Sequence, residues 1–200
     1  DVLPGKPWNP ENSPKIVKAK DIFNKIVEGA WLNGEPGMLW LDRINQDNAT
    51  PEFGKIEAVN PCAEEPLLPN ENCTLGSINL GNFFNVFDGQ RFFDKQRFSV
   101  IVYNAVRFLD NVVEINKHPT EKTQFMGDAT RKIGLGIMGW ADLLAKLDIP
   151  YNSEQALKLA KETGSLLKKS ADSASAKLGF NRGNFPALEG SPLNEKNGGT

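Results

Sequence analysis

Three side chains that one small molecule could contact together lie at the start of the stretch NPCAEEPLLPNENCTLGSINL, residues 60–80. Asn60, Cys62 and Glu64 occupy positions i, i+2 and i+4. In an extended segment these side chains point the same way, with successive ones about 6–7 Å apart. The spacing therefore predicts that an amide, a thiol and a carboxylate converge on one cavity.

The prolines and the glycine of this stretch predict the backbone that must position these groups. Pro61 favours extended geometry at Asn60, and with Pro66 and Pro69 it makes a helix here unfavourable. Gly76 marks a turn into a short apolar run, Ser77 to Leu80. The sequence predicts a stiff loop followed by a strand.

Cys62 and Cys73 are the two cysteines of the chain. Free cysteines are commonly small buried hydrophobic residues, yet both lie in a polar, proline-flanked loop rather than on an apolar stripe. On these grounds two interpretations of the cysteines remain open: they are packing residues, or they are a reactive pair. A structural Cys62–Cys73 disulfide is a third reading, disfavoured in a reducing cytoplasm.

Four blocks of the sequence carry a resemblance to a known family. The loop block Asn60–Leu80 is accompanied by GxPGxLxLDRIN at Gly34–Asn45, AVRFLDNVVEIN at Ala105–Asn116 and RKIGLGIMGWADLLAKLDIPYNSEQA at Arg131–Ala156. Together they closely resemble the large, catalytic chain of ribonucleotide reductases, most of all the adenosylcobalamin-dependent (class II) type. Several blocks in the right order are far more specific than N-x-C-x-E alone.

The resemblance implies a fold, a reaction and four site residues. The fold is a helix-rich part of a ten-stranded α/β barrel with a catalytic finger loop at its centre. The reaction is radical-based reduction of ribonucleotides to 2′-deoxyribonucleotides. Cys62 would carry a thiyl radical that abstracts the 3′ hydrogen, and Glu64 would be the general base for the 3′-OH. Asn60 would hold the sugar hydroxyls and orient Glu64, and Cys73 would be one of two thiols that become a disulfide.

The resemblance also implies partners. Adenosylcobalamin is favoured as the radical source over a separate dimetal subunit, with a thioredoxin-type external reductant and a homodimer in the full-length enzyme. Residues 1–200 are expected to form a single domain, incomplete at both ends, that lacks the rest of the catalytic chain and is inactive alone. The second redox cysteine is expected upstream.

Composition narrows the remaining classes of function. A net charge of −2, with basic residues scattered along the chain, gives no footprint for nucleic acid or an anionic membrane. Apolar runs stay well short of the roughly 20 residues that span a bilayer, so a cytoplasmic protein is expected. Two cysteines and one histidine are too few for a Cys-based zinc site, and no metal ligands are assigned.

Apolar periodicity predicts the surrounding elements. Helices are expected at 16–31 behind a Ser13-Pro14 cap, at 94–116, and from 152 to 178 behind an Asn152/Gln155 capping box. A buried strand is expected at 38–41, a polar connection at 42–55, a brief strand at 56–59 and a loop from 179 onward. His118 is expected at the C-terminal end of the 94–116 helix.

The segment Gly134–Gly139 satisfies G-x-G-x-x-G and supplies a rival function. A dinucleotide-binding loop needs a strand directly before it. The preceding residues carry no strand signal, so a buried helix over Arg131–Leu147 is predicted instead. Two other classes thus stand beside the reductase: a nucleotide-cofactor oxidoreductase built on these glycines, and a non-catalytic helical interaction module whose cysteines only pack.

Overall fold

The computed structural model describes residues 17–194 of the chain. It divides into two compact units, Asp1–Trp40 and Leu41–Thr200, which are described separately. The helices and strands follow one another in the order α1 (Ala19–Asn33), α2 (Leu41–Gln46), η2 (Pro51–Phe53), β1 (Ala58–Val59), β2 (Pro66–Leu67), β3 (Thr74–Asn79), η3 (Leu80–Phe83), β4 (Phe84–Phe87), β5 (Gln90–Phe93), α3 (Lys95–Ile115), α4 (Glu121–Thr130), β6 (Ile133–Met138), α5 (Trp140–Leu147), α6 (Glu154–Arg182) and η4 (Pro186–Leu188).

The first unit contains the predicted N-terminal helix as α1. Gly34 ends it in the left-handed conformation and donates its N–H to the Ala30 carbonyl. The Ser13-Pro14 cap lies outside the described residues. The prediction of a buried strand at 38–41 is wrong: residues 38–40 form no regular element and are exposed, and Leu41 begins α2. Four residues carry too short a pattern to separate a strand from a loop.

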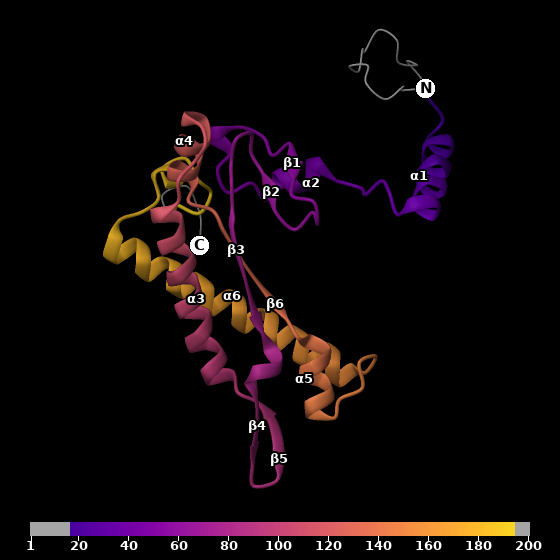
Figure 1. Ribbon diagram of the computed structural model, residues 1–200, viewed down its shortest axis with the longest axis vertical. Coiled ribbons are helices and arrows are strands. Elements are labelled where there is room, and N and C mark those ends of the chain that lie inside the picture. Colours follow the sequence, from indigo (N-terminus) through magenta and orange to yellow (C-terminus); the bar gives the residue numbers. More distant parts are fainter. Residues whose placement is uncertain (1–16, 195–200) are drawn as a thin grey trace. The chain divides into compact units, whose positions relative to one another are not determined.

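A parallel pair of strands, β3 and β6, forms the centre of the second unit (Figure 1). Six residue pairs align in register, from Thr74 with Ile133 to Asn79 with Met138. The prediction of a helix over Arg131–Leu147 is therefore wrong for its first half, because the glycines lie in β6 and only α5 is helical. Gly134 faces the Glu65 and Leu75 side chains so closely that a Cβ would overlap them. Close approach to neighbours is the usual reason for glycine inside a strand.

An apolar core packs where α3, α5, α6 and the hairpin β4–β5 meet the strand pair. In Figure 1, α3 lies beside the β3–β6 pair and packs against α6, and the β4–β5 hairpin extends beyond the strand pair. Phe98 of α3 is fully buried, and its ring lies 5.3 Å from those of both Phe83 and Phe93. Such tilted and edge-to-face aromatic contacts add to the free energy gained from burial alone. The core therefore fixes the far end of β3 through the turn that follows it.

The remaining helices agree with the periodicity in type but differ at their ends. The predicted 94–116 helix is confirmed as α3, capped by the Asp94 carboxylate on the Arg97 N–H. The helix α6 is capped by Ser153 rather than Asn152, and it continues to Arg182 where a loop was predicted. His118 lies beyond the end of α3, and its ring hydrogen-bonds with the Asn72 amide instead of capping that helix.

The predicted connection 42–55 also differs, since it contains α2 and the short helix η2. The brief strand predicted at 56–59 is confirmed only for its second half, as β1. The strand predicted at 77–80 is confirmed as β3, which begins earlier, at Thr74, and ends at Asn79. Within residues 17–194, no helix combines the length and apolar character that crossing a membrane requires.

We expect Phe98→Ala to lower the free energy of unfolding by about 3–5 kcal/mol, because it leaves a cavity among closely packed rings. Phe180→Ala is the matched control, since Phe180 is 91% exposed, and it should change stability by less than about 0.5 kcal/mol. Urea unfolding followed by circular dichroism measures both. Equal losses in the two variants would contradict this assignment of the core.

Candidate functional site

The loop that carries Cys62 is the tip of a short antiparallel hairpin. Ala58 pairs with Leu67 and Val59 with Pro66, so residues 60–65 connect β1 to β2. The Ala63 N–H donates to the Asn60 carbonyl at 3.0 Å, closing a β-turn with Pro61 at its second position. Asparagine at the first and proline at the second position are typical of such turns. The extended geometry predicted for this segment is therefore wrong, because the Asn-Pro pair starts a turn.

The turn changes how the three predicted residues are presented. Asn60 is half-buried, and its side-chain oxygen accepts a hydrogen bond of 3.0 Å from the Glu65 N–H. Cys62 and Glu64 are exposed, and Cys62 is a free thiol. Asn60 therefore closes the hairpin tip, while the thiol of Cys62 and the carboxylate of Glu64 stay accessible. Their catalytic roles remain predictions.

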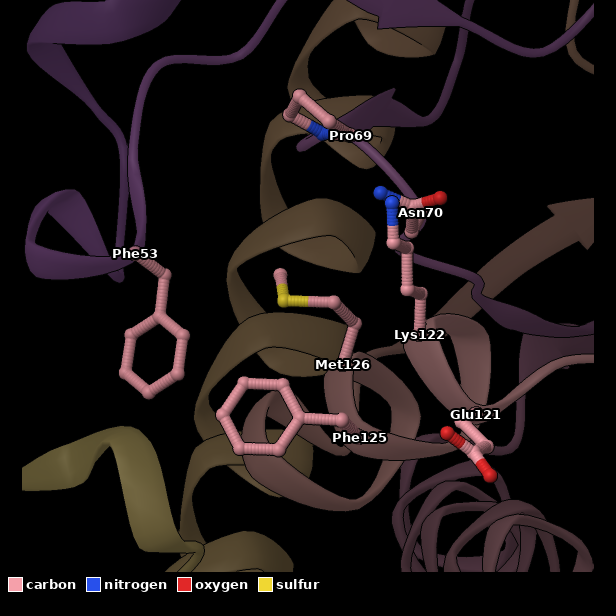
Figure 2. A pocket seen from close by; sticks show the side chains of 7 residues that line it. All are labelled: Phe53, Pro69, Asn70, Glu121, Lys122, Phe125 and Met126. Carbon is pink, nitrogen blue, oxygen red and sulfur yellow. The ribbon is translucent and has the colours of Figure 1, made fainter.

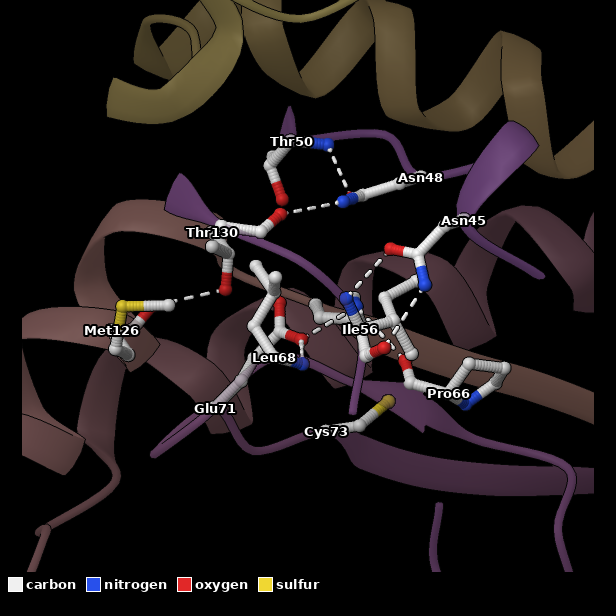
Figure 3. A network of polar contacts seen from close by, with 12 residues as sticks. Asn45, Asn48, Thr50, Ile56, Pro66, Leu68, Glu71, Cys73, Met126 and Thr130 are labelled. Carbon is white, nitrogen blue, oxygen red and sulfur yellow. Dashed lines mark hydrogen bonds and ion pairs between the residues drawn. The ribbon is translucent and has the colours of Figure 1, made fainter. Parts of the chain in front are cut away.

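An asparagine from outside the hairpin supports its base. Asn45, the last residue of the GxPGxLxLDRIN block, donates to the Ile56 carbonyl at 3.0 Å and accepts from the Ile56 N–H at 2.8 Å (Figure 3). The Asn45 side-chain amide thus makes the two backbone hydrogen bonds that a neighbouring strand would otherwise make with Ile56, which lies two residues before β1. Ile56 packs in a small apolar cluster with Leu68 and Met126. The base of the hairpin is therefore held by Asn45 and by apolar packing, and its tip is held by Asn60.

Cys73 lies half-buried directly before β3. Glu65 is half-buried, and the Cys73 thiol donates to the Thr74 carbonyl at 4.0 Å. Burial, with Glu65 as the next largest cause, raises the pKa of the Cys73 thiol, and Lys132 opposes this. Cys73 therefore stays protonated at neutral pH. The structure contains no Cys62–Cys73 disulfide, since both cysteines are free.

A buried ion pair next to Cys73 was not predicted from the sequence. The Lys132 ammonium contacts the Glu71 carboxylate at 2.7 Å and the Pro66 carbonyl at 3.2 Å. The side chain of Glu71 is fully buried, and the same carboxylate oxygen accepts from the Leu68 N–H at 2.8 Å. Figure 3 shows the Glu71 carboxylate beside Leu68, with Cys73 below them in this view. The pair ties β2, the following turn and the start of β6 together, and no local pattern announces it because its members come from distant segments.

A separate pocket of ≈ 400 Å³ lies beside α4 (Figure 2). Apolar groups form much of its wall, and the rings of Phe53 and Phe125 are 6.2 Å apart. Its lining is made by Phe53, Pro69, Asn70, Glu121, Lys122, Phe125 and Met126. None of the four predicted catalytic residues contributes to it. Within residues 17–194, no group of three or more His, Cys, Asp or Glu side chains could hold a metal ion.

Comparison with known proteins identifies the family to which this arrangement belongs. Residues 8–197 match the model described as ribonucleotide reductase, barrel domain. The chain belongs to this family. The structure also resembles a class Id ribonucleotide reductase alpha subunit from Actinobacillus ureae, with a TM-score of 0.67 and 22% identity, covering 86% of this chain and 34% of that one. That likeness concerns the fold.

Two relatives of this ribonucleotide reductase barrel chain are called vitamin B12-dependent ribonucleoside-diphosphate reductases. The protein from Thermoplasma acidophilum is 46% identical over 177 residues, covering 88% of this chain and 23% of the relative. The protein from Mycobacterium tuberculosis (strain CDC 1551 / Oshkosh) is 43% identical over 182 residues, covering 90% and 26%. The chain thus spans about a quarter of the length of these curated relatives.

The structure bears on the two rival functions as well. A dinucleotide-binding loop needs glycines between a strand and a helix, but Gly134 and Gly136 lie inside β6, which starts at Ile133. Only Gly139 separates that strand from α5. The interaction-module reading requires both thiols to be buried, and Cys62 is exposed. Neither rival is supported.

We expect Lys132→Ala to destabilise the chain by about 3–5 kcal/mol, since it leaves the Glu71 carboxylate buried without its counter-charge. Lys168→Ala breaks a lysine–carboxylate pair whose side chains are 77% and 63% exposed, and should cost less than about 0.5 kcal/mol. Urea unfolding measures both losses. The double variant Glu71→Gln/Lys132→Met removes both charges, so it should recover part of the lost stability. A double variant no more stable than Lys132→Ala would argue against the buried-charge explanation.

Proposed function

We propose that this chain forms part of the catalytic barrel of a ribonucleotide reductase and contributes its radical-bearing loop. The match of residues 8–197 to the barrel-domain family carries this proposal. In it, the remaining strands of a ten-stranded barrel come from a longer chain, which functions as a homodimer. The hairpin tip that holds Cys62 is the catalytic finger.

The proposed reaction consumes one ribonucleotide and two thiols and yields one 2′-deoxyribonucleotide, one disulfide and one water. The exposed, free thiol of Cys62 is suited to the first step, in which its thiyl form takes the 3′ hydrogen of the ribose and later returns it. The exposed Glu64 carboxylate accepts the 3′-OH proton as the 2′-OH departs as water. Asn60 orients the loop through its hydrogen bond to the Glu65 N–H.

Cys73 has a different part in this reaction. Its half-buried thiol is held in the protonated form, which suits a group that supplies hydrogen and electrons to the substrate rather than a free nucleophile. It pairs with a second cysteine of the longer chain to form the disulfide. An external dithiol of the thioredoxin type restores both thiols.

We propose adenosylcobalamin as the radical source, which the names of the relatives from Thermoplasma acidophilum and Mycobacterium tuberculosis support. When bound, the cofactor supplies the unpaired electron that Cys62 receives. An accessible thiol at a hairpin tip fits this requirement, since it can approach a group held elsewhere in the barrel. The likeness to the class Id alpha subunit concerns the fold, so it does not favour the alternative of a separate dimetal subunit.

The roles of the two cysteines can be separated in a reductase chain that contains these residues. Cys62→Ser should abolish both turnover and the release of label from 3′-tritiated substrate, because an alkoxyl radical is much harder to form than a thiyl radical. Cys73→Ser should still release label but form little deoxynucleotide, because the substrate radical lacks its reductant.

Both variants are assayed with the natural dithiol reductant, for label release and for product. Label release by Cys62→Ser, or normal product from Cys73→Ser, would show that the two roles are assigned wrongly.

A further inference from the structure

Lys132, the residue directly before β6, contacts the chain on both sides of Cys73. Its ammonium lies 2.7 Å from the carboxylate of Glu71, two residues before the cysteine. Its backbone carbonyl accepts the N–H of Thr74, the residue after the cysteine, at 3.2 Å. The half-buried thiol therefore belongs to a short segment that one distant residue holds at both ends.

The same ammonium also contacts the hairpin that carries Cys62. It donates to the Pro66 carbonyl, in β2, at 3.2 Å. Strand β2 is the strand that leads back from the hairpin tip. The side chain of Lys132 thus joins the strand that follows Cys62 to the segment that precedes Cys73.

Glu71 depends on Lys132 for its counter-charge. The side chain of Glu71 is fully buried, and its Oε2 atom accepts from the Lys132 ammonium and from the Leu68 N–H. Its other oxygen, Oε1, is buried with no hydrogen-bond partner among residues 17–194. Because a buried carboxylate is costly without a counter-charge, loss of the ammonium should displace Glu71 and, with it, the segment of Cys73.

The hairpin tip is held by contacts that do not involve Lys132. The Asn60 N–H donates to the Glu65 carbonyl at 3.3 Å, and the Asn60 side-chain oxygen accepts from the Glu65 N–H at 3.0 Å. These bonds close the turn of Cys62 within the hairpin itself. Removal of the ammonium should therefore move Cys73 relative to the hairpin while the turn of Cys62 stays intact.

We propose that Lys132 is a positioning residue for the reduction step, because it fixes the place of Cys73 relative to the loop of Cys62. This inference rests on the proposed function. Without the ammonium, hydrogen abstraction by Cys62 continues, but the thiol of Cys73 lies out of place for reducing the substrate radical. A displacement of about 1 Å can cost about 10²-fold in rate.

The amount of deoxynucleotide formed per label released from 3′-tritiated substrate tests the proposal in a reductase chain containing these residues. In the double variant Glu71→Gln/Lys132→Met, this ratio should fall about tenfold, while label release changes less than about twofold. A merely structural role would lower label release and product together, because fewer molecules are folded, and would leave the ratio unchanged.

Three further variants sharpen this test. Lys132→Arg keeps a cation that can donate to Glu71 and Pro66, so its ratio should stay within about twofold of that of the unaltered chain. Lys168→Ala breaks an exposed ion pair of α6 and should leave the ratio unchanged. Glu71→Gln alone weakens the contact with Lys132 and should lower the ratio about threefold, which provides the test if the double variant fails to fold.

An unchanged ratio in whichever of Glu71→Gln/Lys132→Met and Glu71→Gln folds would overturn the inference. Cys73→Ser separates this result from a failure of the proposed function. Failed product formation by Cys73→Ser, alongside an unchanged ratio in these variants, would remove the positioning role of Lys132 and leave the proposed function intact. Normal product from Cys73→Ser would instead remove the redox role on which the inference rests.

Discussion

The parallel pairing of β3 with β6 is the constraint on which the second unit depends. The Thr74 N–H donates to the Lys132 carbonyl at 3.2 Å, which continues the pairing to the residue before β6. This contact brings the cation of Lys132 next to the segment of Glu71 and Cys73. The other end of β3 leads directly into the apolar core. One pairing therefore couples the polar surroundings of the thiol to the packing that stabilises the unit.

The helices could be predicted because their information is local. The apolar stripe of α3 and the Asp94 cap lie within one short segment, and the structure agrees with both. The strand β6 could not be predicted in this way. Its pattern is apolar on most sides and rich in glycine, and only pairing with β3, some sixty residues earlier, explains why Gly134 and Gly136 are extended. Glycine lowers helix propensity, and here tertiary contacts make the choice.

The family blocks direct attention to the loop at residues 60–65, but the sequence did not predict the geometry within that loop. Alternation along an extended chain groups Asn60, Cys62 and Glu64 and sends Glu65 the other way. The Asn-Pro turn removes the alternation, and Asn60 uses its side chain to close the hairpin. Glu71 and Lys132 illustrate a second limit, because a buried ion pair between distant segments leaves no periodic signal in either one.

The strand pair also has a practical consequence for handling this polypeptide. Leu75, Ile137 and Met138 are 51%, 41% and 54% exposed, and β3 and β6 form a two-stranded sheet with an unpaired backbone edge on each outer side within the described residues. Apolar strands with open edges recruit other extended chains. Self-association at the concentrations used for crystallisation or NMR is therefore the expected behaviour of these 200 residues in isolation. Two changes should reduce this self-association: charged substitutions at the exposed positions of the two strands, or a co-expressed strand that covers an edge.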